Sequence, residues 1–465
     1  MKKLLKKFIP NWLLGTYHFD LAFFGALIYG FPSRPPIFSF GKHKRVNKLK
    51  VIGVTGTKGK STVVILAGKV LAEGGKKVGW VSSLTINDGK NEVMNPYHMT
   101  MPGRFFIQKM LAQMVKNGCE YALVEVTSEG IKQYRHKFIN FCGAVLTNLA
   151  PEHLEAHGGF DNYRAAKEKL FAAAAKTLNS FGVYNLDDEN VQNFLEYEIK
   201  NKYGYALKNN FQFSISNFQS IFNIKNIQSG ASGSTFEINE VGFKTNLLGE
   251  FNILNCAAAA GVGQACDVSL ENAARALGKI QSIPGRLEII NEGQDFTAVV
   301  DLAHTPDSFE KVFKLFKDLK NSPHPSPLLE KEREKAVKII SVFGSAGGGR
   351  DKWKRPELGK IASANSDNVI ICNEDPYDES PESICQEIAA GCENVKPEII
   401  LDRRQAIAKA LSLAQVSDIV LILGKGTEQT YVEGAKKRDW DDRKVVREEI
   451  KKRGSSLEQN TQRVD

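Results

Sequence analysis

The chain has 465 residues, more than a single hydrophobic core usually serves, so we expect more than one domain. Its apolar fraction of 42% and charged fraction of 25% are typical of a folded globular protein. The seven cysteines include no Cys-x-x-Cys pair, which argues against a disulfide framework or a zinc site and favours reduced thiols in the cytosol. The net charge of +9 suits phosphate-containing ligands or anionic lipid, but no basic patch interleaved with aromatic residues indicates nucleic acid.

Residues 8–31 form an apolar, aromatic segment within the N-terminal part, 1–48. The segment is nearly long enough to span a bilayer, but His18 and Asp20 lie in its middle, and an acid there costs roughly 2.5–3.5 kcal/mol on insertion. No small-residue cleavage site follows, which argues against a signal peptide. A helix pair packed on the protein body and a helix in the membrane interface are equally favoured, and a true span is less favoured.

From residue 49 onward, short buried strands alternate with helical stretches. The predicted strands are LKVIGVTG, KVGWVSS, YALVEVTS and CGAVLTNL in the first half, and FTAVVDLA, KIISVFGS, NVIICNED and DIVLILGK in the second. This alternation predicts an α/β protein with parallel sheets covered on both faces. We expect a central domain over 49–283 with a β-rich edge at 205–250, and a C-terminal Rossmann-like domain over 284–465. The Pro-rich, charged stretch 321–335 is expected to be a surface loop.

The most specific motif is VTGTKGKST at residues 54–62, which follows a strand and opens a helix. Its glycines let the backbone approach phosphates, and a helix N-terminus attracts anions. Lys60 would reach the β- and γ-phosphates, and Ser61 or Thr62 would bind Mg²⁺, which predicts a P-loop-type ATPase domain. An ordinary strand-to-helix turn is the disfavoured alternative. The expected ATP contacts are Thr55, Gly56, Thr57, Lys58, Gly59, Lys60, Ser61 and Thr62.

The shortened loop Gly-Thr-x-Gly-Lys-Ser resembles that of the Mur ligase family and its relative folylpolyglutamate synthetase, although the family usually carries Asn in place of Lys58. Further motifs follow in family order as far as about Val446. EVTSEGIKQYR, residues 125–135, is similar to the E-V-S-S-H-x-L-x-Q-x-R segment of the UDP-N-acetylmuramoyl-tripeptide synthetases. The resemblance implies that Glu125 binds Mg²⁺, and that Thr100, Thr127, Gln133 and Arg135 contact a muramoyl-peptide substrate.

Two residues after this segment look like further members of the metal site. They lie in TNLAPEHLEAH, residues 147–157, and in YRAAKEKLF, which begins at Tyr163. The resemblance implies a second Mg²⁺ bound by His153 and by a carbamoylated Lys167, because CO₂ turns an amine into a carboxylate-like ligand for a hard cation. Without the resemblance, Lys167 would be interpreted as a lysine on a helix surface.

The segment LLGEFNILN resembles the family's adenine-binding stretch, in which Asn252 and Asn255 would face the base. The segments IPGRLE and VVDLAHTPDS supply Arg286, Asp301 and His304, which the family uses around the ribose and phosphates. An Asp at the end of a strand can accept from ribose hydroxyls. The alternative for Asp301 is a helix N-cap.

The last group of motifs concerns the incoming amino acid. By resemblance, Arg350, Glu374, Gly424 and Glu428 would hold it. Tyr377 stands where enzymes that add meso-diaminopimelate carry an arginine for the distal carboxylate, and a tyrosine has no charge to offer. The resemblance therefore leaves lysine or another amino acid open.

About fifty residues precede the phosphate loop, whereas relatives in this branch carry an N-terminal domain that binds uridine diphosphate. A UDP-linked acceptor and a lipid-linked acceptor are therefore both open. The resemblance implies an ATP-dependent, ADP-forming ligase of peptidoglycan synthesis that activates a carboxylate as an acyl phosphate. Lys60, Lys167 and His304 would be its catalytic residues, and ATP, a muramoyl peptide and an amino acid its substrates. We expect a cytoplasmic monomer, with contact of residues 8–31 with the inner face of the plasma membrane as an open alternative.

Three alternatives to this function remain open. The first is a related ligase of the folylpolyglutamate or polyglutamate type. The segments EVTSEGIKQYR, residues 125–135, and GKGTE, residues 424–428, favour the muramoyl branch over it. The second is the Mur-like subunit of an amidotransferase, a type whose four-cysteine zinc ribbon is not visible. The third is a catalytically silent, membrane-associated nucleotide-binding scaffold, which has no evident need for Lys60, Glu125, His153 and Lys167 together.

Overall fold

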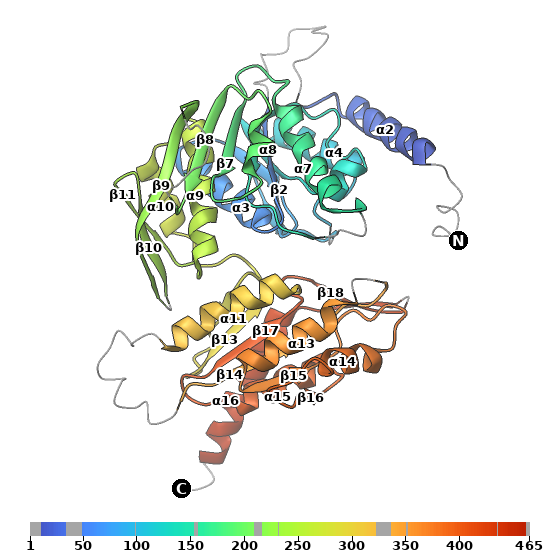
Figure 1. The fold of residues 1–465 in the computed structure, drawn as a ribbon, viewed down its shortest axis with the longest axis vertical. Coiled ribbons are helices and arrows are strands. Elements are labelled where there is room, and N and C mark those ends of the chain that lie inside the picture. Colours follow the sequence, from blue (N-terminus) through green and yellow to red (C-terminus); the bar gives the residue numbers. More distant parts are fainter. Residues whose placement is uncertain are drawn as a thin grey trace. The chain divides into compact units, whose positions relative to one another are not determined.

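The structure is a computed structural model of the chain. It describes residues 11–33, 49–97, 99–152, 157–208, 216–230, 232–321, 336–349, 352–434 and 436–461. These residues form two compact units. Unit 1 comprises Met1–Ser229 and Gly233–Gln281, and unit 2 comprises Gly230–Ser232 and Ser282–Asp465. Figure 1 shows unit 1 in blue to yellow-green and unit 2 in yellow to red.

Unit 1 is built on a large sheet whose described strands run in the order β11-β10-β9-β8-β7-β6-β1-β5-β2-β3-β4. All neighbours from β2 to β9 pair in parallel. The strands are β1 Lys50–Thr55, β2 Val78–Val81, β3 Thr85–Asn87, β4 Glu92–Met94, β5 Tyr121–Glu125, β6 Phe141–Leu146, β7 Phe181–Asn185, β8 Asn201–Ala206, β9 Phe218–Gly230, β10 Gly233–Ile238 and β11 Val241–Thr245. This confirms the predicted α/β class with a parallel sheet.

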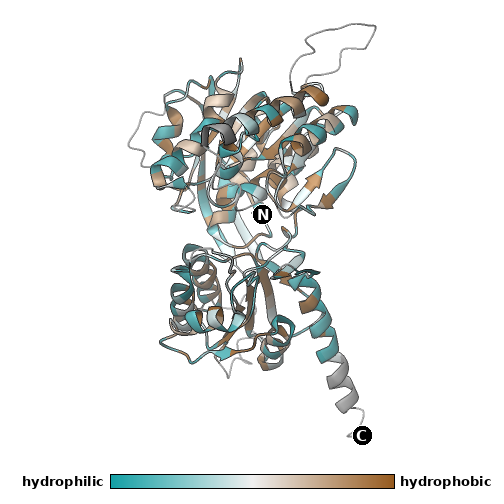
Figure 2. Ribbon diagram, turned by 90° about the vertical axis from the view of Figure 1, so that its right-hand side faces the viewer, coloured by the Kyte–Doolittle hydropathy of each residue, from teal (hydrophilic) through white to brown (hydrophobic). Residues whose placement is uncertain are grey.

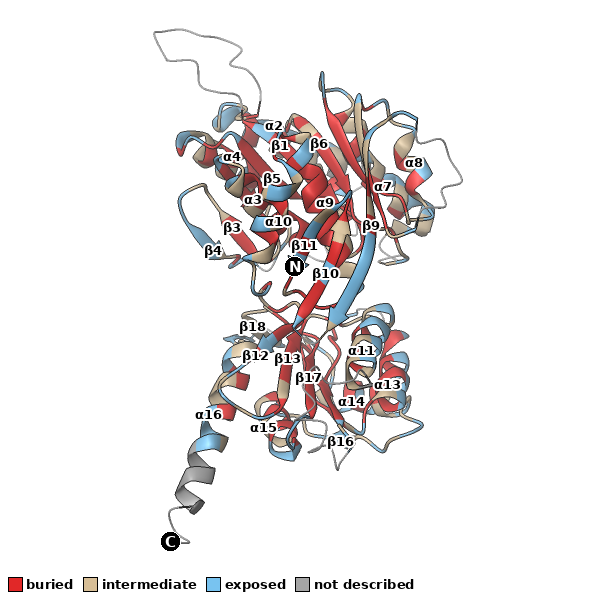
Figure 3. Ribbon diagram, turned by 90° about the vertical axis from the view of Figure 1, so that its left-hand side faces the viewer, coloured by how far each residue is buried: buried red, intermediate tan, exposed pale blue. Residues whose placement is uncertain are grey.

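Helices cover both faces of this sheet, which is why its central strands are continuous apolar runs and appear buried in Figure 3. On one face, a Cβ added to Gly53 of β1 would lie 2.5 Å from Leu170 of α7. On the other face, a Cβ added to Gly68 of α3 would lie 2.6 Å from Trp80 of β2. The described helices of unit 1 are α2 Asn11–Ile28, α3 Lys60–Glu73, α4 Arg104–Lys116, α5 Ser128–Lys132, α7 Phe160–Ala174, α8 Val191–Leu195, α9 Glu250–Ala265 and α10 Leu270–Gly278.

Unit 2 is a second α/β layer structure around a sheet of order β12-β13-β17-β14-β15-β16. Its strands pair in parallel except for β12 with β13, and β18 with β19 form a separate antiparallel hairpin. The strands are β12 Glu288–Ile290, β13 Thr297–Asp301, β14 Ile339–Phe343, β15 Asn368–Ile371, β16 Glu398–Ile399, β17 Ile419–Leu423, β18 Thr430–Glu433 and β19 Lys436–Asp439. The described helices are α11 Pro306–Asn321, α13 Lys354–Asn365, α14 Pro381–Ala389, α15 Arg403–Leu413 and α16 Asp442–Thr461.

The structure differs from the sequence-based expectation in local detail. The described part of the N-terminal segment is the single helix α2, which packs against α4, and not a pair of helices. The small β3–β4 hairpin extends the sheet of unit 1 and was not predicted. None of the helices in the described ranges is long and apolar enough to cross a membrane. Most of the stretch predicted as a surface loop, 322–335, lies outside those ranges.

A fully buried ion pair joins three elements of unit 2. Arg403, the first residue of α15, donates from Nε and Nη2 to the carboxylate of Asp442 at 2.9 and 2.6 Å, and from Nη2 to the Leu423 carbonyl at 2.9 Å. Both side chains of the pair are completely buried. A buried charge that loses its partner is strongly destabilising, because no water can solvate it.

We predict that Arg403→Leu lowers the free energy of unfolding by about 3–5 kcal/mol, because it leaves the Asp442 carboxylate buried without its cation. The neighbouring Arg404→Leu is the matched control, since Arg404 is 38% exposed and pairs with Glu448 and Glu449 at the surface. Its cost should stay within about 1 kcal/mol. Urea unfolding followed by circular dichroism measures both variants, and equal losses would contradict this account of the buried pair.

Candidate functional site

The turn between β1 and α3 has the geometry of a phosphate-binding loop. Strand β1 ends at Thr55 and helix α3 begins at Lys60. Gly56 and Gly59 both have positive φ, at 146° and 80°, and an added Cβ would overlap Thr147 Oγ1 and Asn255 Oδ1, respectively. Only glycine therefore fits either position. The loop places its backbone amides and the N-terminus of α3 at the carboxyl edge of the sheet, where anions bind favourably.

The segment that follows β6 holds this loop in shape. Thr147 Oγ1 and Asn148 Nδ2 donate to the Lys58 carbonyl at 2.6 and 3.0 Å, and the Lys58 amide donates to Asn148 Oδ1 at 2.9 Å. Thr57 Oγ1 exchanges hydrogen bonds with the backbone of Ala150 and lies 3.1 Å from the hydroxyl of Tyr163. Both sides of the loop are thereby fixed by side chains from elsewhere in the chain.

Three lysine side chains converge on the phosphate loop. Lys60 Nζ donates to the Thr57 carbonyl at 2.7 Å, and Lys167 Nζ donates to the Gly56 carbonyl at 2.6 Å. Lys58 Nζ pairs with the Glu152 carboxylate at 2.7 Å, in the segment after β6. Three cations around one turn repel each other, and that repulsion is relieved when a polyanion binds between them.

Lys167 is the most unusual of the three. It belongs to α7, its side chain is only 2% exposed, and its ammonium lies 4.4 Å from the ring centre of Tyr163. Burial, together with the positive charge of Lys60, lowers the pKa of Lys167 well below its usual value. The sequence without the family resemblance indicated a surface lysine, and that interpretation is wrong.

An oxygen-rich cluster lies at the start of α3. Ser61 Oγ donates to Glu125 Oε2 at 2.8 Å and lies 2.7 Å from Ser83 Oγ, and the Ser83 amide donates to the same carboxylate oxygen at 2.7 Å. Hydroxyl and carboxylate oxygens are suitable ligands for a hard divalent cation. Within the described ranges, no three His, Cys, Asp or Glu side chains gather as a metal site, and the predicted ligand His153 lies outside them.

The predicted adenine-binding residues lie on α9, next to the phosphate loop. Asn255 Nδ2 donates to Asn252 Oδ1 at 3.0 Å, and Asn252 Nδ2 donates to the Leu248 carbonyl at 2.8 Å. Both asparagines are buried. The Oδ1 atom of Asn255 faces Gly59, so α9 forms one wall beside the loop.

The segment after β5 brings together the residues that were predicted to bind the acceptor substrate. One of them, Thr127, also has a structural role. Arg135 donates from Nη2 to Gln133 Oε1 at 2.6 Å and from Nη1 to the carbonyl of Met101, close to Thr100. Thr127 accepts from the Gly130 amide at 3.0 Å and so caps helix α5. Its hydroxyl therefore already has a structural partner, which the sequence did not indicate.

In unit 2, Asp301 closes the turn that contains Arg286. Its two carboxylate oxygens accept from the backbone amides of Leu287 and Ala303, both at 2.7 Å. It does not cap the following helix, which begins at Pro306. Burial raises the pKa of Asp301. His304 follows in the same turn, and its Nδ1 lies 2.7 Å from the Leu302 carbonyl oxygen.

The residues of unit 2 that were predicted to hold the incoming amino acid lie around a buried lysine, which the sequence did not lead us to expect there. Lys425 Nζ contacts Asp375 and Glu428, both at 3.0 Å. Glu374 is buried, burial raises its pKa, and its Oε2 lies where a Cβ on Gly424 would be. The Gly-Lys-Gly run at 424–426 was the available signal for Lys425. Arg350 lies outside the described residues.

Both units are similar to domains of known proteins. Residues 54–263 match the Mur ligase middle domain, and residues 285–426 match the Mur ligase, glutamate ligase domain. A UDP-N-acetylmuramyl-tripeptide synthetase of Borreliella afzelii is 38% identical over 415 residues, which cover 87% of this chain and 77% of that protein. The enzyme of the same name from Treponema denticola is 36% identical over 439 residues, 91% and 77% of the two chains.

Other relatives have different names. A UDP-N-acetylmuramoyl-L-alanyl-D-glutamate–2,6-diaminopimelate ligase of Geobacillus kaustophilus is 33% identical, with 88% of this chain and 80% of that protein covered. A solved structure of a ligase of that name has a TM-score of 0.57 at 27% identity, covering 87% of this chain and 79% of its own. MurF ligase from Thermotoga maritima in complex with ADP has a TM-score of 0.61 at 17% identity, covering 94% and 84%, and therefore shows a shared fold.

We predict that Gly59→Ala weakens ATP binding by roughly tenfold, because its Cβ would displace Asn255 and the adjacent loop amides. Gly75→Ala is the matched control, since Gly75 has a similar φ of 77° but nothing within 4 Å of an added Cβ. Both variants should carry the same backbone strain of about 1–2 kcal/mol. Titration calorimetry with ATP separates the two effects, and equal affinities would refute the role of the Gly59–Asn255 contact.

Proposed function

The chain belongs to the Mur ligase family, and we propose that it uses ATP to join an amino acid to a muramoyl peptide during the synthesis of peptidoglycan precursors. The acceptor would be UDP-N-acetylmuramoyl-L-alanyl-D-glutamate or a similar molecule, as the names of the relatives indicate. Its distal carboxylate would be activated as an acyl phosphate and then transferred to the amine of the amino acid.

The observation that supports this proposal most strongly is the convergence of Lys60 and Lys167 on the carbonyls of the phosphate loop. A loop with two glycines at positive φ, a helix N-terminus and adjacent ammonium groups is suited to a nucleoside triphosphate. The related MurF ligase from Thermotoga maritima forms a complex with ADP. We assign the whole stretch Thr55–Thr62 to the ATP phosphates, and Asn252 and Asn255 to the base.

The reaction needs no protein nucleophile. A carboxylate oxygen of the acceptor attacks the γ-phosphorus of ATP, the bond to the bridging oxygen breaks, and ADP leaves. The amine of the amino acid then attacks the acyl carbon, the tetrahedral intermediate collapses, and inorganic phosphate leaves while the amine loses a proton. Lys60 and the loop amides stabilise the charge that develops on the transferred phosphoryl group. A phosphate oxygen could take the place of the Thr57 carbonyl as acceptor from Lys60, since both are oxygen acceptors.

The residues around α3 fit Mg²⁺. Ser61 and Glu125 present a hydroxyl and a carboxylate oxygen 2.8 Å apart, which is the donor chemistry that this ion prefers. Bound there, Mg²⁺ would neutralise phosphate charge. The protein supplies a fixed place for it, because the Ser83 amide donates to the same Glu125 oxygen and holds the carboxylate in position.

A carbamate on Lys167 would complete a second cation site with His153. The Lys167 amine is buried beside the loop, and burial and the charge of Lys60 lower its pKa, which favours the neutral form that attacks CO₂. The new N–C bond forms with loss of one proton, and the product is an anion. An anion at this position is stabilised by Lys58 and Lys60, whereas an ammonium there is repelled by them.

The remaining assignments place the acceptor in unit 1 and the amino acid in unit 2. Gln133 and Arg135 form a polar pair that suits the carboxylates of a muramoyl peptide, with Thr100 and Thr127 near them. Arg286, Asp301 and His304 would serve the nucleotide, and Arg350, Glu374, Gly424 and Glu428 the amino acid. Contact of residues 8–31 with a membrane is a separate proposal that depends on the surface of α2.

We predict that the purified chain releases phosphate from ATP only when both the acceptor and one amino acid are present. Lys60→Ala should lower kcat by on the order of a thousandfold, because it removes the cation nearest the transferred phosphoryl group. A coupled phosphate assay with UDP-N-acetylmuramoyl-L-alanyl-D-glutamate and single amino acids measures this.

The matched control for this assay is Lys69→Ala, a lysine on the same helix that pairs with Glu92 at the surface and should leave the rate unchanged. Full activity of Lys60→Ala would refute the assignment. Release that ignores the acceptor would refute the proposed substrate. Activity on a lipid-linked muramoyl peptide alone would identify the other form of the acceptor.

We predict that Lys167→Ala lowers kcat by roughly a hundredfold or more and that short-chain carboxylic acids restore part of it, because they replace the missing carbamate. Lys169→Ala, an exposed lysine on the same helix, is the control. The rate is measured with increasing formate or acetate at constant ionic strength. A folded Lys167→Ala enzyme that no acid rescues would contradict the carbamate.

A further inference from the structure

Helix α2 buries its small residues and exposes its large ones. Ala22 and Ala26 are buried, and a Cβ on Gly25 would lie 3.3 Å from the backbone of Phe105 in α4. Phe19 and Phe23 are partly exposed, but their rings contact Tyr134 and Phe138 of unit 1. The opposite face carries four exposed large apolar side chains: Tyr17, Phe24, Leu27 and Ile28, with Ile28 65% exposed. A helix that packs on a protein in water normally shows the reverse distribution, because burial of large apolar groups is favourable.

These side chains form one continuous surface, which we call the α2 face. Tyr17, Phe24 and Ile28 follow one another along the helix at intervals of seven and four residues, and Leu27 flanks this line. Phe105 of α4, which is also exposed, extends the surface beside Gly25. Figure 2, which looks onto the side of the molecule that carries α2, colours the ribbon by hydropathy and shows apolar residues along this helix. Contiguous apolar surface of this kind marks an interaction site.

Contacts with unit 1 fix which side of the helix faces outward. His18 Nδ1 forms a close hydrogen bond with Arg104, and the ring of Phe19 lies 6.3 Å, edge to face, from that of Tyr134. The ring of Phe23 lies 5.5 Å from that of Phe138. The orientation of the helix is therefore determined by polar and aromatic contacts, and the α2 face is held outward by them.

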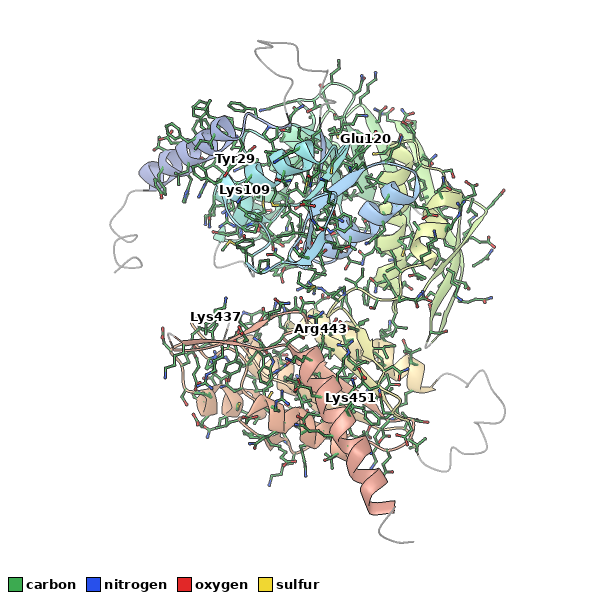
Figure 4. The ribbon with its side chains drawn as sticks, turned by 180° about the vertical axis from the view of Figure 1, so that it is seen from behind. Tyr29, Lys109, Glu120, Lys437, Arg443 and Lys451 are labelled. Atoms are coloured by element: carbon green, nitrogen blue, oxygen red, sulfur yellow. The ribbon has the colours of Figure 1, made fainter. Side chains whose placement is uncertain are left out.

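Lysines accompany α2 in the sequence and in the structure. Lys2, Lys3, Lys6 and Lys7 precede the helix in the sequence. Lys137 lies over the ring of Tyr134, and Lys109 projects from α4, the helix on which α2 packs. Figure 4 labels Lys109 together with Tyr29 at the end of α2. Lysines beside aromatic and aliphatic side chains suit anionic lipid headgroups over an acyl boundary.

We propose that the α2 face binds the surface of an anionic lipid bilayer, with the helix lying in the plane of the interface. Asp20, which is exposed on this face, favours the depth of the headgroups over the hydrocarbon interior. The helix contacts Tyr134, which lies between Gln133 and Arg135. Membrane binding would therefore hold the acceptor-binding segment close to the bilayer, a consequence that rests on the proposed function.

The test is flotation of the full chain with vesicles of phosphatidylcholine and phosphatidylglycerol, compared with phosphatidylcholine alone. We expect binding only to the anionic vesicles, and weaker binding as salt increases. The triple variant Phe24→Ser, Leu27→Ser, Ile28→Ser should lower the partition coefficient about 100-fold. Lys6→Gln and Lys7→Gln should each lower it about fivefold. Leu178→Ser and Val416→Ser, at apolar residues exposed elsewhere, should leave it unchanged.

Circular dichroism establishes that the triple variant is folded, and the two lysine variants test the same proposal through charge alone. Equal binding of the triple variant and the unaltered chain would overturn the proposal. Absence of flotation with the unaltered chain would also overturn it. If sedimentation then shows a dimer that the triple variant dissociates, the α2 face is covered by a second copy of the chain instead of a membrane. Flotation does not need ATP or acceptor, so its outcome is independent of the ligase assay.

Discussion

The pairing of β1 between β5 and β6 is the constraint on which the site in unit 1 depends. The carboxyl ends of three adjacent parallel strands meet at one edge, so the loop after β1, the carboxylate at the end of β5 and the segment after β6 become neighbours. Thr147 and Asn148 can then bind the backbone of Lys58, and Glu125 can accept from Ser61. Residues about 90 positions apart in the chain thereby shape a turn of four residues. Without that strand order, the two glycines would permit many loop conformations.

Positive charge that is only partly neutralised is concentrated at the same edge of the sheet. Two ammonium groups donate to loop carbonyls, and a third pairs with Glu152, so the loop carries more positive charge than its immediate partners neutralise. The burial of Lys167 increases the cost of its charge, which lowers its pKa. A triphosphate between these cations, or an anion on Lys167 itself, relieves this cost. The fold thus places the cations at the loop before any ligand binds.

Several residues with an expected ligand role also have a structural one. Thr127 caps α5, and Asp301 joins two backbone amides across a turn. In unit 2, Lys425 lies completely buried between Asp375 and Glu428, beside Glu374. Such polar networks orient side chains because every buried charge must find a partner. The polar residues of the site therefore position each other as well as any substrate.

The sequence by itself determined the eight apolar strands named above, the phosphate loop and the family, because these depend on local patterns: apolar runs, glycines at fixed spacing, and short motifs in order. The β3–β4 and β18–β19 hairpins could not be predicted in this way, since short elements carry little periodicity. Only the tertiary structure decided that Lys167 is buried, that Thr127 is a cap, and that α2 shows its large residues to the outside. Burial and partner choice depend on which distant elements pack together, and a pattern along the chain does not contain that information.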